Sequence, residues 1–493
     1  MTKRANMPSS FLRSRRLPLR RGSSLPIVVA GALALALSLV PVCGAAFDLL
    51  PSGAGAGVPV AHAEVRKSDV ILGSSVDSRG LSVAQSPSIE AKYAICMGSD
   101  GTVYYERDAD SPSQIASVTK VMTGLVALKA VDDGIVSLDT PVEVSAEAAS
   151  VGESSAGLLY GDVMPLQTAL AALLVPSGND AAVAIAQTVG QAMIDAGTAS
   201  SADPEQAFVD AMNEEALALG CADTVYENPH GLDDDGFEGN LHSTARDVAL
   251  VVREAMGYQQ FRDAVALGDT DITVSRAGSD ATIHLVATDQ FPQYTEYAVG
   301  VKTGFTSLAG ACFAGATNKD GLELYSVVLG CEDESTRFQD AATLAEWVYD
   351  HLVTYPLANS PDRVAMDGAQ VPVVAEVACL DWIDKTVPAT MEDPSATVEL
   401  FDLNGNISQT VEFYEPTGEV RTGDVVGHIT FTQRNTIVAS QDLVACESVA
   451  APGIFERVGI FFDRLVRNFT GAEQHARSVV LNTTTLIVDK TAS

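Results

Sequence analysis

The alternation of hydrophobic and polar positions predicts a first block of mixed helices and strands. Strand-like runs at 89–96 and 102–106 are joined by a Gly-containing turn and predict a hairpin. Residues 133–260 carry mainly helical periodicity, which is strongest at 163–174, 180–196, 204–219 and 243–256. Strand patterns then return at 270–276, 281–287, 297–303, 310–317 and 322–330, and a helical pattern follows at 336–352. This order predicts an α/β fold with one sheet and helices segregated around it.

A different sequence pattern begins after Pro356, where short apolar runs alternate with turn residues. Asn404-Gly405 and Thr417-Gly418 are typical turn pairs. The strand-like runs lie at 370–377, 396–402, 411–414, 427–432 and 436–439. We therefore expect a small, mainly antiparallel all-β domain over residues 356–448, after a first domain over residues 85–355. No catalytic constellation is apparent within the β domain.

Residues 449–471 contain an amphipathic pattern with helical spacing. One face collects large apolar side chains, and the other collects three arginines and other polar groups. The apolar face comprises Ile454, Phe455, Val458, Phe461, Phe462, Leu465, Val466 and Phe469. A helix of this kind either lies in a membrane surface or docks on its own protein, and both interpretations stay open. Residues 472–493 are expected to form a tail.

The N-terminal segment, residues 1–63, has a basic start, an apolar middle and Ala61-His62-Ala63 before Glu64. These features are typical of a secretory signal peptide, with an uncleaved anchor as the alternative. Residues 64–84 are rich in Ser, Gly and Asp and are expected to be a linker. An exported chain would act at the outer face of the cytoplasmic membrane or in the cell wall.

The charge balance of the 493-residue chain argues against a nucleic-acid partner, because its formal net charge is −34. Seven cysteines occur, and none has the close spacing of a metal site. No ligand spacing is found at five of the histidines either, so no metal is implied; these are His242, His284, His351, His428 and His475. Export would permit disulfides, with buried free thiols as the alternative.

Three short motifs carry the candidate chemistry. Ser117 stands at the start of a helical pattern with Lys120 one turn later, so a buried neutral amine could remove the proton of the hydroxyl. Ser177-Gly178-Asn179 follows an apolar helix at a break, and Lys302-Thr303-Gly304 ends a strand pattern. Each motif alone is weak evidence for catalysis. Together they form the Ser-x-x-Lys, Ser-x-Asn, Lys-Thr-Gly set of penicillin-binding proteins and class A β-lactamases.

On these motifs the sequence resembles a low-molecular-weight penicillin-binding protein, a serine-type D-alanyl-D-alanine carboxypeptidase of peptidase family S11. The resemblance covers about residues 85–470 and includes the stretches 174–182, 228–232 and 243–247. It implies a β-lactamase/transpeptidase-like fold, in which an antiparallel sheet has flanking helices and a helical block. The small β domain and the amphipathic C-terminal helix also match the domain order of the family.

The resemblance further implies a role for each motif residue. Ser117 would be the acylated nucleophile, Lys120 its general base and Ser177 a proton relay. Asn179 would hold the substrate amide, and Lys302 with Thr303 would bind the terminal carboxylate of a peptidoglycan stem peptide ending in D-Ala-D-Ala, or of an inhibiting β-lactam. The backbone N–H groups of Ser117 and of Phe305, which follows Gly304, would hold the oxyanion. No cofactor is needed.

The sequence departs from the family pattern at two places, and three other functions stay open. Phe305 stands where some family members carry a histidine, and His242 directly precedes Ser243-Thr244. A D,D-endopeptidase would use the same residues, a β-lactamase is disfavoured by the absence of a suitably placed Glu-x-x-x-Asn, and a catalytically silent wall-binding protein is the third rival. His230 is expected to brace the fold, and the run Asp233-Asp234-Asp235 is expected to be a solvated loop.

Overall fold

The computed structural model describes residues 86–234 and 236–487. The expected signal peptide and linker, residues 1–84, lie outside the described residues. Within the described part, no helix has the length and apolar character needed to cross a bilayer. The first block contains the helices α3 (Lys120–Asp132), α4 (Leu166–Leu174), α5 (Asn179–Ala196), α6 (Pro204–Ala218), α7 (Ala245–Ala255), α8 (Gln259–Val265) and α9 (Thr336–Asp350). Single 3₁₀ turns are η1 (Ala116–Thr119), η2 (Ala148–Ser150) and η3 (Phe291–Gln293).

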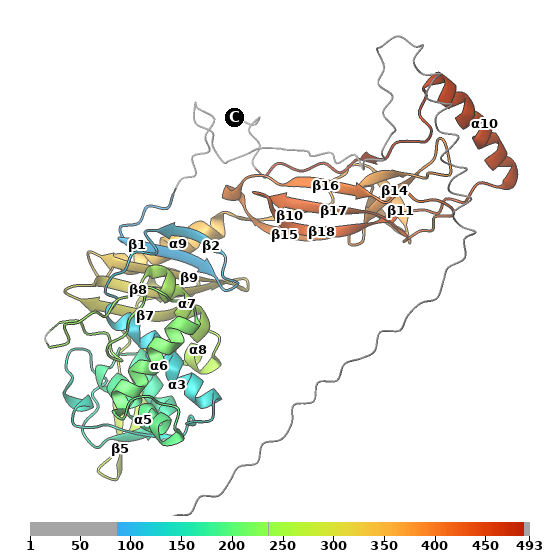
Figure 1. The fold of residues 1–493 in the computed structure, drawn as a ribbon. Helices are drawn as coiled ribbons and strands as arrows, with labels where there is room; N and C mark the ends of the chain where they lie inside the picture. The colour runs from blue at the N-terminus through green and yellow to red at the C-terminus, as the bar shows by residue number, and fades with distance from the viewer. Residues whose placement is uncertain (1–85, 235, 488–493) are drawn as a thin grey trace, which may run out of the picture. The chain divides into compact units, whose positions relative to one another are not determined.

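A five-stranded antiparallel sheet is the centre of this block (Figure 1). Its strands, in spatial order, are β2 (Val103–Arg107), β1 (Tyr93–Gly98), β9 (Leu322–Cys331), β8 (Gly310–Lys319) and β7 (Ala298–Thr306). Most residues of β8 and β9 are buried on both sides. Helix α9 covers one face, where Phe338 packs edge-on against Phe313 of β8 at 4.9 Å. Helices α3 and α7 belong to the core on the other face.

The expectation of one sheet is wrong, because four strands form a separate antiparallel sheet. These strands are β3 (Pro141–Glu143), β4 (Val163–Pro165), β5 (Thr270–Arg276) and β6 (Ser279–Leu285). The helix expected from residue 163 accordingly begins at Leu166, since 163–165 pair with β3. The mainly helical interpretation of 133–260 fails for 133–165, where short strands and turns replace helix. Pairing between distant segments overrides local periodicity there.

The other expected elements are confirmed with small shifts of their ends. The hairpin pairs β1 with β2, and α5, α6, α7 and α9 lie where helical periodicity predicted them. Helix α6 starts where Asp203 caps it, with the carboxylate accepting a hydrogen bond from Gln206 N at 2.9 Å and Pro204 in the first turn. Helix α8 was not predicted, because only two of its seven residues are buried and it carries little periodic signal.

The second block is mainly β structure, as expected. A six-stranded antiparallel sheet consists of β16 (Ser408–Phe413), β17 (Val425–Gln433), β18 (Thr436–Ala445), β14 (Thr386–Met391), β13 (Ala375–Ala378) and β19 (Val479–Val480). Two further strand pairs are β10 (Leu352–Pro356) with β15 (Thr397–Phe401), and β11 (Arg363–Met366) with β12 (Ala369–Pro372). A single turn, η4 (Asp402–Asn404), follows β15. The block has its own hydrophobic core, which includes Trp382, Phe431 and Leu443.

The C-terminal part departs from the expected tail. Helix α10 (Ile454–Thr470) forms as predicted, and none of its residues is buried. The chain after α10 then returns to the β sheet as β19, which pairs with β13.

The six cysteines among the described residues are buried free thiols, so the alternative of disulfides is not realised among them. They are Cys96, Cys221, Cys312, Cys331, Cys379 and Cys446.

The contact between α5 and α6 generates a stability prediction. A Cβ atom at Gly190 would lie 1.9 Å from the carbonyl oxygen of Pro204, so Gly190→Ala forces the two helices apart. We expect a loss of about 1–3 kcal/mol of unfolding free energy. Gly459 in α10 has no heavy atom within 4 Å of such a Cβ, and Gly459→Ala is the matched control, expected to be neutral or stabilising. Thermal unfolding followed by circular dichroism measures both. Equal melting temperatures for the two variants would contradict this packing.

Candidate active site

Ser117 lies in the η1 turn that leads directly into α3. Ten of the thirteen residues of α3 are buried, so the helix is held in the core on nearly all sides. The turn is reached through Ala116, which is buried and has a left-handed φ of 49°. A loop glycine, Gly231, packs against it so closely that a Cβ atom there would lie 2.0 Å from the Ala116 carbonyl oxygen. The position of Ser117 is therefore fixed from both sides.

The side chain of Lys120 is fully buried beneath Ser117. Its Nζ lies 2.8 Å from Ser117 Oγ, 2.7 Å from Asn179 Oδ1 and 2.8 Å from the His230 carbonyl oxygen. Burial holds the pKa of Lys120 well below its usual value, the positive charge of Lys302 lowers this pKa further, and Asp180 partly opposes both effects. The arrangement favours the neutral amine.

The three partners of Lys120 also determine where its lone pair points. The amide oxygen of Asn179 and the carbonyl oxygen of His230 can only accept hydrogen bonds. A neutral amine keeps two hydrogens, and these two acceptors take both of them. The lone pair is then left for Ser117 Oγ, which can donate its proton. The geometry thus suits proton transfer from the serine hydroxyl to the lysine.

The second motif begins at a strained turn before α5. Ser177 has a φ of 64°, is buried, and its Oγ has no hydrogen-bond partner among the described residues. Asn179, the first residue of α5, is oriented by a 3.0 Å hydrogen bond from its Nδ2 to the Gly152 carbonyl oxygen. Asp180 accepts hydrogen bonds from Ser155 Oγ and two backbone N–H groups in the same loop, which fixes that loop beside the motif.

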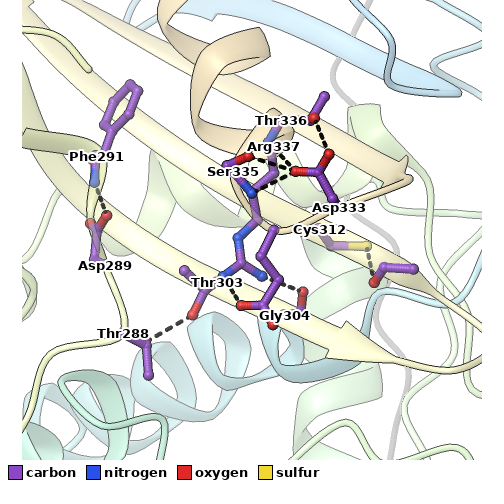
Figure 2. Close-up of polar contacts among 12 residues, drawn as sticks. Thr288, Asp289, Phe291, Thr303, Gly304, Cys312, Asp333, Ser335, Thr336 and Arg337 are labelled. Atoms are coloured by element: carbon purple, nitrogen blue, oxygen red, sulfur yellow. Dashed lines mark hydrogen bonds and ion pairs between the residues drawn. The ribbon is translucent and has the colours of Figure 1, made fainter. Parts of the chain in front are cut away.

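The third motif lies on β7. Lys302 is buried, and its Nζ donates to the carbonyl oxygen of Thr303 at 2.8 Å. Burial, followed by the charge of Arg337, lowers the pKa of Lys302 to about 7, although Asp289 opposes the shift. Thr303 Oγ1 is 2.9 Å from Thr288 Oγ1, as Figure 2 shows.

Glycine is required at the end of the third motif, because β7 passes directly against η1. A Cβ atom on Gly304 would lie 2.8 Å from the Ile115 carbonyl oxygen and 3.1 Å from Ser117 N. The approach brings the strand backbone alongside the backbone N–H of Ser117. Phe305 follows with an exposed ring.

These groups border one cavity of about 640 Å³. Six of the eight candidate residues line it, and Lys120 and Lys302 do not. The complete lining is Ser117, Glu153, Ser154, Ser177, Asn179, Leu232, Asp234, Thr288, Gln290, Thr303, Gly304, Phe305, Thr306, Ser307, Glu334, Ser335, Arg337 and Phe338. The two lysines are buried and contact the lining residues Ser117, Asn179 and Thr303.

Arg337 is a site residue that the sequence reasoning missed. Its Nη1 donates to the Gly304 carbonyl oxygen at 3.1 Å (Figure 2). Its Nη2 contacts Glu334 at 2.9 Å. Asp333 fixes the start of α9 by accepting hydrogen bonds from the backbone of Ser335 and Thr336, and so positions the arginine. An arginine in a helical pattern belongs to no short motif, and only the tertiary contact identifies it.

Two other expectations have clear outcomes. His230 is buried, its Nδ1 accepts a hydrogen bond from Leu232 N, and burial lowers its pKa to about 3, as suits a residue that braces the fold. The solvated-loop prediction is wrong for Asp233, which is buried and accepts a 3.0 Å hydrogen bond from Thr306 Oγ1. Three consecutive acidic residues suggested exposure, but this one turns inward to the end of β7.

Comparison with known proteins agrees with this geometry. Residues 81–333 match the family described as peptidase S11, D-alanyl-D-alanine carboxypeptidase. The D-alanyl-D-alanine carboxypeptidase DacF of Bacillus subtilis is 29% identical over 277 residues, which cover 56% of this chain and 66% of the relative. DacC of Escherichia coli is 27% identical over 386 residues, covering 76% and 88%. The crystal structure of DacD from Francisella tularensis shares the fold, with a TM-score of 0.52 and 22% identity over 78% of this chain and 97% of that one.

The fold and the three convergent motifs define a penicillin-binding serine peptidase. The chain belongs to the D-alanyl-D-alanine carboxypeptidase family, peptidase S11. It is a serine-type carboxypeptidase, and the expectation drawn from its motifs is confirmed at the level of family and fold.

The pKa of Lys302 generates a pH prediction. Because this pKa is lowered to about 7, the ammonium is lost as pH rises through that value. We expect KM for a peptide with a free terminal carboxylate to rise above neutrality, by up to about tenfold per pH unit. Lys302→Arg keeps its charge and should give a flatter KM profile, whereas Lys319→Arg on β8, outside the cavity, should behave as the parent. Steady-state kinetics across neutrality measure this. The same slope in all three proteins would contradict the assignment.

Proposed function

We propose that this chain removes the terminal D-alanine from peptidoglycan stem pentapeptides through an acyl-enzyme on Ser117. The observation that carries the proposal is the set of three short hydrogen bonds around Lys120 Nζ, which leave its lone pair for the Ser117 hydroxyl. The relatives named as D-alanyl-D-alanine carboxypeptidases support the choice of substrate.

In the acylation half of the reaction, Ser117 Oγ attacks the carbonyl carbon between the last two D-alanines while its proton passes to Lys120 Nζ. The tetrahedral oxyanion accepts hydrogen bonds from the backbone N–H groups of Ser117 and Phe305. The close passage of Gly304 against η1 supports this pairing of donors. Ser177, whose hydroxyl is otherwise unpartnered, relays the proton to the departing amine. D-alanine leaves, and the peptide stays esterified to Ser117.

In the second half, water attacks the ester carbonyl, and Lys120 accepts a proton from it. The peptide is released as a shortened acid, and Ser117 regains its proton. A β-lactam carries an acyl group and a carboxylate in similar positions, so it acylates the same serine.

The substrate is oriented by its two ends. Lys302 and Thr303 bind the terminal carboxylate, since a free carboxylate needs a cation and a hydroxyl donor. Arg337, which lines the cavity, adds a second positive charge, and Asn179 holds the substrate amide.

The rival functions separate by substrate and by chemistry. A D,D-endopeptidase would use the same residues on a peptidoglycan crosslink, and a wall-binding protein would need no reactive serine. The arrangement of the Lys120 amine favours a catalytic role over a binding role, because a purely structural lysine needs no hydroxyl on its lone pair.

The deciding experiment incubates the mature chain, residues 64–493, with a muropeptide that ends in D-Ala-D-Ala and with a crosslinked dimer. We expect mass spectrometry to show the loss of one alanine from the pentapeptide. Ser117→Ala should lower the rate by roughly 10⁴-fold or more. Ser279→Ala, at an exposed serine of β6, is the control and should keep full activity.

Two outcomes would overturn the proposal. Cleavage of the dimer with an untouched pentapeptide would make the chain an endopeptidase. Full retention of activity in Ser117→Ala would remove the acyl-enzyme mechanism.

We also propose where the enzyme works. Residues 1–63 direct export, residues 64–84 form a linker, residues 85–355 form the catalytic domain and 356–448 the β domain. The enzyme then acts outside the cytoplasm, at the outer face of the cytoplasmic membrane, on the peptidoglycan there. The family assignment supports extracytoplasmic action.

We propose further that α10 binds the membrane surface. The eight residues of its apolar face are all exposed, and Phe455 and Phe469 reach 93% and 83% of full exposure. A helix that is apolar on one face and unburied throughout matches an interfacial helix. The apolar face would enter the boundary between headgroups and acyl chains.

The membrane proposal predicts that Phe455→Ser with Phe469→Ser lowers vesicle binding strongly. Each buried phenylalanine contributes about 1.5–3 kcal/mol, so each loss should weaken partitioning by about tenfold or more. Asn468→Ser, a polar change on the same helix, should bind like the parent. Sedimentation with lipid vesicles gives the three affinities. Equal binding by all three proteins would exclude the apolar face of α10 as the contact.

A further inference from the structure

Helix α10 is inserted within the β domain. The helix lies between two strands of the same sheet, because β18 precedes it and β19 follows it. Figure 1 shows α10 in red. Both ends of the helix are therefore connected to one folded sheet, and neither end is free.

The segment that leads into α10 is held by Trp382. The indole Nε1 donates a 3.0 Å hydrogen bond to the carbonyl oxygen of Ala450, in the segment before the helix begins at Ile454. Farther along, the Arg464 guanidinium donates to the carbonyl oxygens of Leu380 and Trp382. Ile460 packs against the core of the β domain between these two contacts. One side of the helix thus faces the β domain.

The segment after α10 is fastened more firmly. Val479 and Val480 pair with β13, and the backbone N–H groups of Leu481 and Asn482 both donate to the Val374 carbonyl oxygen, at 2.9 and 2.8 Å. These contacts extend the six-stranded sheet at its β13 edge.

Asn482 is the most deeply held residue of this segment, with 5% of its surface exposed. Its side-chain Nδ2 donates to the Leu357 carbonyl oxygen and to Gln409 Oε1, and its Oδ1 accepts from Asn359 N. The Gln409 side chain in turn donates to the Asn482 carbonyl oxygen. Every hydrogen-bonding atom of the Asn482 amide group therefore has a partner inside the β domain.

The three arginines of α10 are all engaged with the protein. Besides Arg464, Arg457 Nε donates to the Pro452 carbonyl oxygen at 3.0 Å. Arg467 donates to Asp463 Oδ2 at 3.3 Å and to the Glu473 carbonyl oxygen at 3.0 Å. Each arginine thus has an acceptor within the protein, and the net charge of −34 opposes the approach of the chain to anionic headgroups.

We propose that residues 472–487 form a clasp, a segment that pairs with the β domain and so fixes the C-terminal end of α10. The helix is then held at both ends, and its contact with a bilayer is apolar and independent of lipid charge. The bilayer part of this inference rests on the proposed membrane function, whereas the clasp does not. The occupant of the exposed face is a lipid surface, because the eight large apolar side chains of that face are all exposed while Ile460 and Arg464 hold the helix against the β domain.

The clasp is tested by hydrogen exchange of the mature chain followed by mass spectrometry. We expect strong protection in residues 478–482 and in the β13 edge that they cover. Asn482→Ala should speed exchange in both segments by at least about tenfold and leave the first domain unchanged. Asn468→Ala, the same substitution on exposed α10, is the control and should change neither. Rapid exchange of residues 478–482 in the parent protein would overturn the clasp, whatever the membrane result.

The charge independence is tested by sedimentation with neutral phosphatidylcholine vesicles and with vesicles that also contain phosphatidylglycerol, at low and high salt. We expect equal binding to both, unchanged by salt. Binding that needs the anionic lipid and falls with salt would overturn the apolar contact. Protection of the clasp without binding to either vesicle would reject the membrane function and leave the clasp. A concentration-dependent dimer that binds no vesicle would assign the exposed face to a second copy.

Discussion

The burial of the Lys120 amine is the constraint on which the rest of the site depends. An ammonium removed from water is strongly disfavoured unless it is paired, so the amine either loses its proton or finds acceptors. Here the partners of the neutral amine come from three separate segments: the start of α5 supplies the Asn179 oxygen and the loop before Asp233 supplies the His230 carbonyl as acceptors, and the η1 turn supplies the Ser117 hydroxyl as donor. Each segment must arrive within hydrogen-bond distance of one atom, and this requirement accounts for the left-handed backbone at Ala116 and the absence of a side chain at Gly231.

The cations of the site are also linked to one another. The charge of Arg337 lowers the pKa of Lys302, and the charge of Lys302 lowers the pKa of Lys120. A carboxylate that binds beside Lys302 opposes this repulsion and favours its charged form. Substrate binding is therefore coupled to the protonation of Lys302. The neutral state of Lys120 depends on how completely the bound carboxylate offsets the charge of Lys302. One row of positive charges thus serves both to bind an anion and to hold a base in its reactive form.

The sequence was sufficient for the elements and motifs that depend on local pattern. Helices α5, α6, α7 and α9 follow from periodicity, and Ser117, Ser177 and Lys302 are found because each belongs to a short motif. The sequence was insufficient where contacts between distant segments determine the secondary structure or the position of a side chain. Residues 163–165 are a strand only because β3 lies beside them, and Arg337 joins the site only because α9 packs over β8 and β9. The acidic neighbours of Asp233 in the sequence predict a solvated side chain, but its carboxylate accepts a hydrogen bond from Thr306, which is 73 residues away on β7.

Helix α10 shows the same division between pattern and placement. Its periodicity identifies one apolar face but does not say what that face meets, since docking on the protein and lying in a bilayer produce the same sequence pattern. The placement is decided by contacts with the β domain. Trp382 holds the segment before the helix, Arg464 donates to the carbonyl oxygens of Leu380 and Trp382, and the buried amide of Asn482 holds the returning chain against the sheet. With both ends held, rotation of the helix to bury Phe455 and Phe469 against its own domain would break these contacts, and the aromatic face is left outward by default.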